Sequence, residues 1–149
     1  MAPLGDEPVI IRPAAAADVP ALCGLVLELG YAGATEEVSR RLARILADDD
    51  QAVRVAERGG CVVGWIQVQA TKLLESDPRG EIVGLVVTAA ERRRGVGAAL
   101  VRAAEEWARG HGLTLMGVRS NQVRLDAHRF YERLGYAVTK TQLSFRKKL

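Results

Sequence analysis

The chain has 149 residues, of which 48% are hydrophobic and 26% charged, the proportions of an ordinary globular domain. Its 21 basic and 18 acidic side chains leave a formal net charge of +3, too small for a dedicated nucleic-acid binder, and 5% aromatic residues supply no base-stacking platform. Two cysteines and two histidines exclude a disulfide-rich scaffold and a four-cysteine zinc site.

No segment of the sequence predicts a signal peptide or a membrane span. Residues 1–9 carry Asp6 and Glu7 and lack an apolar block. The longest uncharged apolar runs are far shorter than the ~20 residues that cross a bilayer. We therefore expect a soluble, cytoplasmic protein that forms a single domain over residues 1–149 and binds no metal.

Strand-like and helix-like patterns alternate from the beginning of the chain. Residues 9–12 predict a strand, which Pro13 ends. Residues 19–29 carry apolar side chains at spacings of three and four and predict a helix that Gly30 ends, with Asp18 as its N-cap. A second amphipathic helix is expected over residues 35–46.

The pattern then changes to a period of two. Residues 53–56 and 61–69 predict two strands joined by a hairpin, because Gly59-Gly60 is a strong turn signal. A polar loop is expected over residues 75–80. The near-continuous apolar run at residues 81–87 then predicts a central strand that is covered on both faces.

The last third of the chain continues the alternation. An apolar stripe at helical spacing begins at Val96 and predicts a helix. The elements expected after it are a strand at residues 113–118, a helix around residues 127–134 and two strands at residues 136–140 and 143–146. This order predicts an α/β (α+β) fold in which helices cover a mixed sheet.

The sharpest local signal is the run Arg92-Arg93-Arg94-Gly95-Val96-Gly97 between a buried strand and a helix. Glycines allow a ligand to approach the backbone, and a helix start with adjacent arginines favours an anion such as a pyrophosphate. A dinucleotide fingerprint would need a third glycine where Leu100 stands, and no P-loop is present. The alternative is a solvated arginine run before an ordinary helix.

This turn resembles the signature Arg/Gln-x-x-Gly-x-Gly/Ala of the GNAT superfamily of N-acetyltransferases, which Arg92, Gly95 and Gly97 fill. Residues 126–136 are similar to the family's Phe-Tyr-Glu-x-x-Gly-Phe segment. The form Ala-His-x-Phe-Tyr, with Ser120-Asn121 upstream, looks like members that modify small amines, including aminoglycosides and aminoalkylphosphonates. The resemblance implies a mostly antiparallel central sheet with helices on both faces and splayed central strands.

The resemblance also implies acetyl-CoA as cosubstrate. Its pantetheine arm would pair with one strand, its pyrophosphate would lie on backbone amides of the glycine-rich turn, and an asparagine would touch it as well. The residues that would bind it are Leu85, Val86, Val87, Arg92, Arg93, Arg94, Gly95, Val96, Gly97, Ala98 and Asn121.

Acetyl transfer needs an oxyanion donor, an acid for the leaving thiolate and a neutral amine. A backbone N–H at Val86 or Val87 could stabilise the oxyanion. By the resemblance, Tyr131 is the acid, although its helical spacing also fits a core residue. Val83 stands where related sequences often have glutamate, so Glu81, two residues earlier on the same strand face, is the candidate base. The alternative for Glu81 is a solvated charge at a strand end.

These residues predict an N-acetyltransferase that transfers acetyl from acetyl-CoA to a primary amine, expected to belong to a small molecule, by direct attack. Two alternatives stay open: an enzyme for protein or peptide N-termini, and a non-catalytic acyl-CoA-binding sensor. We expect neither nucleic acid nor membrane as a partner. A homodimer is a candidate assembly because strand-rich members of the family often dimerise.

Overall fold

The computed structural model describes residues 5–31, 34–120 and 122–149. The chain divides into two compact units, Met1–Val118 and Arg119–Leu149, which are described separately below. A single domain over the whole chain stays a prediction. No helix within the described ranges has the length and apolar character needed to cross a membrane.

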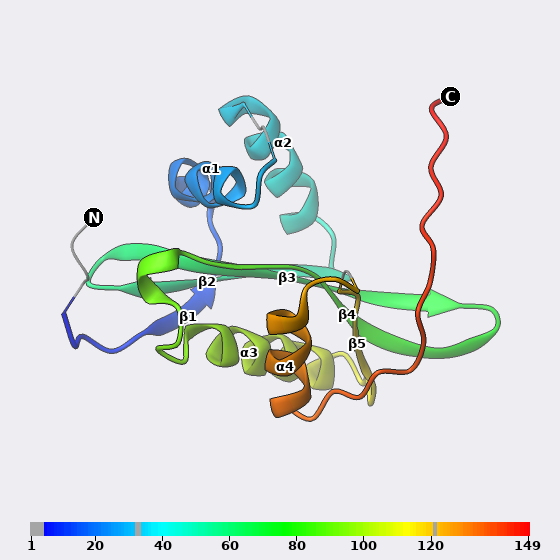
Figure 1. Ribbon diagram of the computed structural model, residues 1–149. Helices are drawn as coiled ribbons and strands as arrows, with labels where there is room; N and C mark the ends of the chain where they lie inside the picture. Colours follow the sequence, from blue (N-terminus) through cyan, green and yellow to red (C-terminus); the bar gives the residue numbers. More distant parts are fainter. Residues whose placement is uncertain (1–4, 32–33, 121) are drawn as a thin grey trace. The chain divides into compact units, whose positions relative to one another are not determined.

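The first unit contains a five-stranded sheet in the order β1-β2-β3-β4-β5 (Figure 1). Successive strands are antiparallel up to β4, and β5 runs parallel to β4. The strands are β1 (Ile10–Pro13), β2 (Gln51–Arg58), β3 (Cys61–Leu73), β4 (Ser76–Val87) and β5 (Met116–Val118). The expected mixed, mostly antiparallel sheet is thereby confirmed.

Helices cover both faces of this sheet, as expected (Figure 1). Two lie on one face, α1 (Val19–Glu28) and α2 (Thr35–Leu46), and α3 (Val96–Gly110) lies on the other. Two short 3₁₀ helices, η1 (Ala16–Asp18) and η2 (Ala89–Glu91), precede α1 and follow β4. The second unit contains α4 (Leu125–Arg133).

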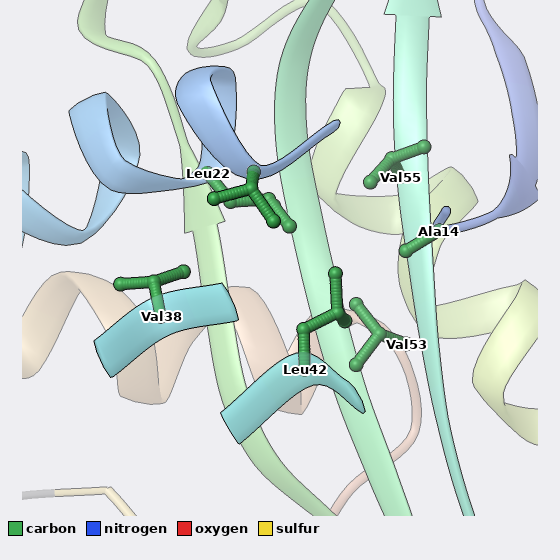
Figure 2. Packing of buried hydrophobic residues seen from close by; sticks show 7 residues of the cluster. Ala14, Leu22, Val38, Leu42, Val53 and Val55 are labelled. Atoms are coloured by element: carbon green, nitrogen blue, oxygen red, sulfur yellow. The ribbon is translucent and has the colours of Figure 1, made fainter. Parts of the chain in front are cut away.

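The core between the sheet and the first two helices consists of small aliphatic side chains (Figure 2). Leu22 of α1 and Leu42 of α2 pack against Val53 and Val55 of β2. Each such side chain contributes about 1.5–3 kcal/mol when it is fully buried. Trp65 of β3 packs at the margin of this cluster, which shows that its side of β3 faces α1 and α2.

Asp18 connects the first strand to the first helix. Its carboxylate accepts two hydrogen bonds of 2.8 Å from Arg12 and one of 2.8 Å from the Ala15 backbone N–H. These bonds, led by those from Arg12, hold the pKa of Asp18 below its ordinary value. Asp18 occupies the expected N-cap position of α1, but its side chain bonds to the preceding turn instead of to the helix.

Two sequence predictions are wrong. The polar segment 75–80 is no loop, because β4 begins at Ser76 and Thr71 pairs with Arg79 across the hairpin. The chain after residue 135 contains no strand among the described residues. Alternating apolar residues are present there, but Val138 is 76% and Phe145 is 88% exposed. A strand needs a neighbouring backbone to supply its hydrogen bonds, and no strand pairing involves residues 136–149 among the residues that the structure describes.

Candidate active site

The glycine-rich turn lies between β4 and α3. Gly95 is the N-cap of α3 and adopts a left-handed conformation with φ 81°. Arg93 has φ 63° and is the one residue other than glycine with positive φ in the described ranges. The first intrahelical hydrogen bond runs from Ala99 N–H to Gly95 C=O at 3.1 Å. The N–H groups just before it, from Val96 to Ala98, therefore have no partner within the helix and suit an anion.

The strand that leads into this turn has an open edge. The pairing of β4 with β5 ends at Ile82 and Val118, although β4 continues to Val87. Within the described part of the first unit, residues 83–87 are paired only with β3. An open strand edge can pair with an extended ligand. It includes Leu85, Val86 and Val87, the three residues predicted to pair with the pantetheine arm.

A β-bulge at Val83 interrupts β4 at the point where β5 ends. Gln67 pairs with Gly84 and the next residue, Val68, pairs with Ile82, so Val83 has no partner of its own. Its side chain is 45% exposed. Bulges redirect a strand and are frequent beside active sites. Val83 therefore marks the place where the two central strands stop pairing.

Trp65 and Gly84 form a close contact beside the bulge. A Cβ atom on Gly84 would lie 2.7 Å from the Trp65 ring, so the absence of a side chain allows the indole to lie on β4. The indole N–H of Trp65 is buried and has no hydrogen-bond partner among the described residues. Because buried donors are normally satisfied, this group is a candidate contact for a bound substrate.

A row of polar side chains continues from Trp65 along the same face of the sheet. Alternate residues of a strand share a face, which places Gln67, Gln69 and Thr71 on the side that faces α1 and α2. Gln67 donates to Gln51 of β2 at 2.9 Å, and the Thr71 hydroxyl donates to Glu81 at 2.7 Å. Such a row can bind a polar acceptor molecule.

Glu81 is a buried residue of this row and not the solvated strand-end charge that the sequence also allowed. It is 6% exposed, and a guanidinium nitrogen of Arg79 lies 3.9 Å from Oε1. The bond from Thr71 occupies Oε2. A carboxylate in this setting can accept a proton from an amine that lies over the sheet. Its role as base stays a prediction.

The three arginines of the turn differ in their surroundings. Arg94 bonds through Nη1 to Glu91 Oε1 at 3.0 Å and through Nη2 to the Gly5 carbonyl at 3.3 Å. Arg92 and Arg93 are exposed. The predicted cofactor contacts of all three stay predictions. Because the Arg94 side chain is bonded to Glu91 and to the Gly5 carbonyl, we expect Arg94 to contact the cofactor through its backbone N–H.

Glu28, at the end of α1, reaches the end of β4. Its Oε1 accepts a hydrogen bond of 3.0 Å from the Thr88 hydroxyl. This contact joins α1 to the segment that leads into the glycine-rich turn. It also fixes a second carboxylate near the open edge of β4.

The second unit contains Tyr131 on α4. Its ring makes edge-to-face contacts with Phe130 and Tyr136, at centroid distances of 5.1 and 5.9 Å. Burial raises the pKa of the Tyr131 phenol, and the charge of Arg124 opposes that shift. The phenol is therefore held in the neutral form that an acid needs. Asn121, also predicted to touch the cofactor, lies outside the described residues.

Sequence reasoning missed Thr71, Trp65 and Glu91. The alternation of β3 could have placed Trp65 and Thr71 on one face, but their pairing with β4 depends on the bulge at Val83. In the sequence, Glu91 is simply the residue before the arginine run at 92–94. Its burial could not be predicted, because its partner Arg58 is 33 positions away.

Comparisons with known proteins identify the family of the chain. Residues 21–136 match the model of the acetyltransferase (GNAT) family. The chain is 41% identical over 92 residues to an aminoalkylphosphonate N-acetyltransferase of Salmonella typhimurium, covering 61% of this chain and 60% of that one. It is 31% identical over 116 residues to an aminoglycoside N(6')-acetyltransferase of Klebsiella aerogenes, covering 73% of this chain and 76% of that one.

Among solved structures, the aminoglycoside N-acetyltransferase AAC(6')-Iy in complex with CoA superposes with a TM-score of 0.87 over the full length of both chains. The two sequences are 21% identical, so this likeness concerns the fold. The match to the family model and the similarity to the Klebsiella relative show the family of the chain as well as its fold. The chain belongs to the GNAT family of acetyltransferases.

Proposed function

We propose that the protein transfers the acetyl group of acetyl-CoA to a primary amine of a small molecule by direct attack. The observation that carries the proposal is the open edge of β4, which runs directly into a turn with unpaired helix N–H groups. The names of the two relatives, which act on aminoglycosides and aminoalkylphosphonates, support a small amine as acceptor.

The cosubstrate would bind along β4 and the glycine-rich turn. The pantetheine arm, with its amide groups, would pair with the backbone at Leu85–Val87 as an added strand does. The pyrophosphate would accept hydrogen bonds from the amides between Arg93 and Ala98, at the positive end of α3. The exposed side chains of Arg92 and Arg93 add positive charge at the same end.

The reaction forms one bond and breaks one. The amine nitrogen attacks the thioester carbonyl, a C–N bond forms, and the C–S bond breaks to release CoA. A backbone N–H at Val86 or Val87 would stabilise the oxyanion. The proton lost by the amine passes to Glu81, and Tyr131 donates a proton to the leaving thiolate.

The need for Glu81 depends on the acceptor. An alkyl amine with a pKa of about 10.4 must lose its proton at pH 7 at a cost of roughly 4.6 kcal/mol. An amine with a pKa near 7.8 needs only about 1 kcal/mol. A buried carboxylate fixed by Thr71 is therefore most valuable for a basic alkyl amine, which favours a small alkyl amine over a peptide N-terminus.

Cosubstrate binding is tested by thermal unfolding. Acetyl-CoA should raise the melting temperature, because a ligand that binds only the folded state stabilises it. Gly97→Glu places bulk and negative charge at the first turn of α3 and should abolish the shift. Gly110→Glu introduces the same residue at the other end of α3, where a Cβ meets open space, and should keep the shift. A shift that survives in Gly97→Glu would locate the pyrophosphate site elsewhere.

The acceptor is tested by measuring CoA release with a panel of amines. The panel should include aminoglycosides, aminoalkylphosphonates and peptides with a free N-terminus. Release with a small amine supports the proposal, and release with peptides alone would favour the N-terminal acetyltransferase. Binding of acetyl-CoA without release for any amine would favour a sensor.

A further inference from the structure

A buried ionic cluster lies beneath the glycine-rich turn. Glu91, the last residue of η2, is only 1% exposed. Its Oε2 accepts a hydrogen bond of 3.0 Å from Arg58 Nε, and its Oε1 accepts one of 3.0 Å from Arg94 Nη1. One carboxylate thus binds an arginine from the end of β2 and an arginine from the turn itself.

The same two arginines hold the chain before β1. Arg58 Nη1 donates to the carbonyl of Glu7, and Arg94 Nη2 donates to the carbonyl of Gly5 at 3.3 Å. Arg94 also lies 3.8 Å from the carboxylate of Asp6. The cluster therefore joins three segments that are distant in sequence: the residues before β1, the end of β2 and the turn before α3.

The turn needs such an anchor, because its own side chains contribute little packing. Residues 92–95 are exposed, and Arg93 adopts a left-handed conformation that costs roughly 1–2 kcal/mol for a residue other than glycine. A strained backbone persists only where its surroundings hold it in place. The bond from Arg94 to the buried carboxylate is a side-chain link between the turn and the body of the first unit.

We propose that Glu91 is a positioning residue for the phosphate-binding turn: with Arg58 and Arg94 it holds the backbone amides of residues 93–98 in the geometry that binds the pyrophosphate of acetyl-CoA. The inference rests on the proposed function, because it assigns the turn to that pyrophosphate. Both carboxylate oxygens of Glu91 are bonded to arginines, so Glu91 would contact neither the thioester nor the acceptor. It acts through the turn alone, so its effect depends on whether the thioester substrate carries a pyrophosphate.

The test compares Glu91→Gln with wild type. Titration calorimetry with CoA, the probe for the turn, should show affinity reduced about tenfold. Steady-state kinetics with the best amine of the panel should show a similar increase in KM for acetyl-CoA with kcat changed less than twofold. With S-acetylpantetheine, which lacks the pyrophosphate, kcat/KM should change less than twofold.

A matched control and a second variant complete the experiment. Glu37→Gln makes the same change in an exposed pair, in which Glu37 and Arg41 lie 3.5 Å apart, and should leave CoA affinity unchanged. Should Glu91→Gln fail to fold by circular dichroism, Arg58→Gln replaces it, because this variant keeps the bond between Glu91 and Arg94. It removes the bond that holds Glu91 to the end of β2, so it should also weaken CoA binding.

Three results would overturn the inference. They are unchanged CoA affinity in a folded variant, equal losses with acetyl-CoA and S-acetylpantetheine, and failure of both variants to fold, which would make the cluster a determinant of stability only. Failure of the proposed function looks different, because the wild-type protein itself would then bind no CoA, or would bind it without releasing CoA in the presence of a small amine.

Discussion

The Thr71 hydroxyl of β3 and the Glu81 carboxylate of β4 form a hydrogen bond of 2.7 Å. The two residues are not opposite each other, since Thr71 pairs with Arg79 and Gln69 pairs with Glu81, so the bond is diagonal. It fixes one carboxylate oxygen and leaves Oε1 near Arg79. If Glu81 is the base, this bond orients it toward the acceptor.

Glu81→Gln removes the proton acceptor and keeps the shape of the side chain. With a basic alkyl amine at pH 7, kcat/KM should fall by roughly 10²-fold, within the usual range for general base catalysis. The loss should shrink as the pH approaches the pKa of the amine, because the neutral amine then needs no base. The pH–rate profiles of variant and wild type check this. A loss that is the same at pH 7 and pH 10 would rule out Glu81 as the base. Thr71→Val, which only frees the carboxylate to rotate, should cause a smaller loss.

Two glycines should respond in opposite ways to replacement by alanine. Gly84→Ala forces a Cβ to within 2.7 Å of the Trp65 ring, and overpacking of this kind costs typically 1–3 kcal/mol. Gly24 lies within α1, and a Cβ there meets nothing within 4 Å. Gly24→Ala should therefore raise the free energy of unfolding by about 0.5–1 kcal/mol. Urea denaturation measures both, and a neutral Gly84→Ala would contradict the close contact.

Local signals were enough to predict the features that one short segment determines. Gly59 and Gly60 form the predicted hairpin with φ of 56° and 77°, and Gly95 forms the predicted turn before α3. The predicted strands 136–140 and 143–146 failed because alternation indicates a strand but does not supply its partner.

The site depends more on contacts between distant segments. The buried position of Glu81 follows from the register of β3 and β4, and the open edge of β4 follows from the short β5. No local pattern determines either feature. The family resemblance predicted the roles of the turn and of the strand before it. The link from Glu91 to Arg58 could be identified only from the folded structure.

Arg93→Gly separates backbone strain from charge at the turn. Glycine adopts φ 63° without penalty, so the variant should gain roughly 1 kcal/mol in the free energy of unfolding. It also loses a guanidinium beside the proposed pyrophosphate site, so CoA affinity should fall. Urea denaturation and calorimetry measure the two effects in one variant. Higher stability with unchanged CoA affinity would remove the Arg93 side chain from the site and leave only its backbone there.

Tyr131→Phe tests the acid, because it keeps the ring and removes only the hydroxyl. Loss of a general acid should lower turnover by roughly 10²-fold or more, with little change in acetyl-CoA affinity. Single-turnover acetylation is the appropriate measurement, since slow product release would mask the effect. Tyr136→Phe removes a hydroxyl from the ring 5.9 Å away and serves as the matched control, with near-normal turnover expected.

The pH dependence gives the same hypothesis a second test. Burial raises the pKa of Tyr131 above its ordinary value of 10.0, so the phenol stays almost fully protonated up to about pH 9 and can donate over that range. Wild-type turnover should therefore show no loss from Tyr131 ionisation between about pH 7 and pH 9, and the ratio of Tyr131→Phe to wild-type rates should stay constant over that range. A ratio that rises toward 1 below about pH 9 would mean that the phenol ionises early. Unchanged single-turnover rates in Tyr131→Phe would leave this ring with a packing role alone.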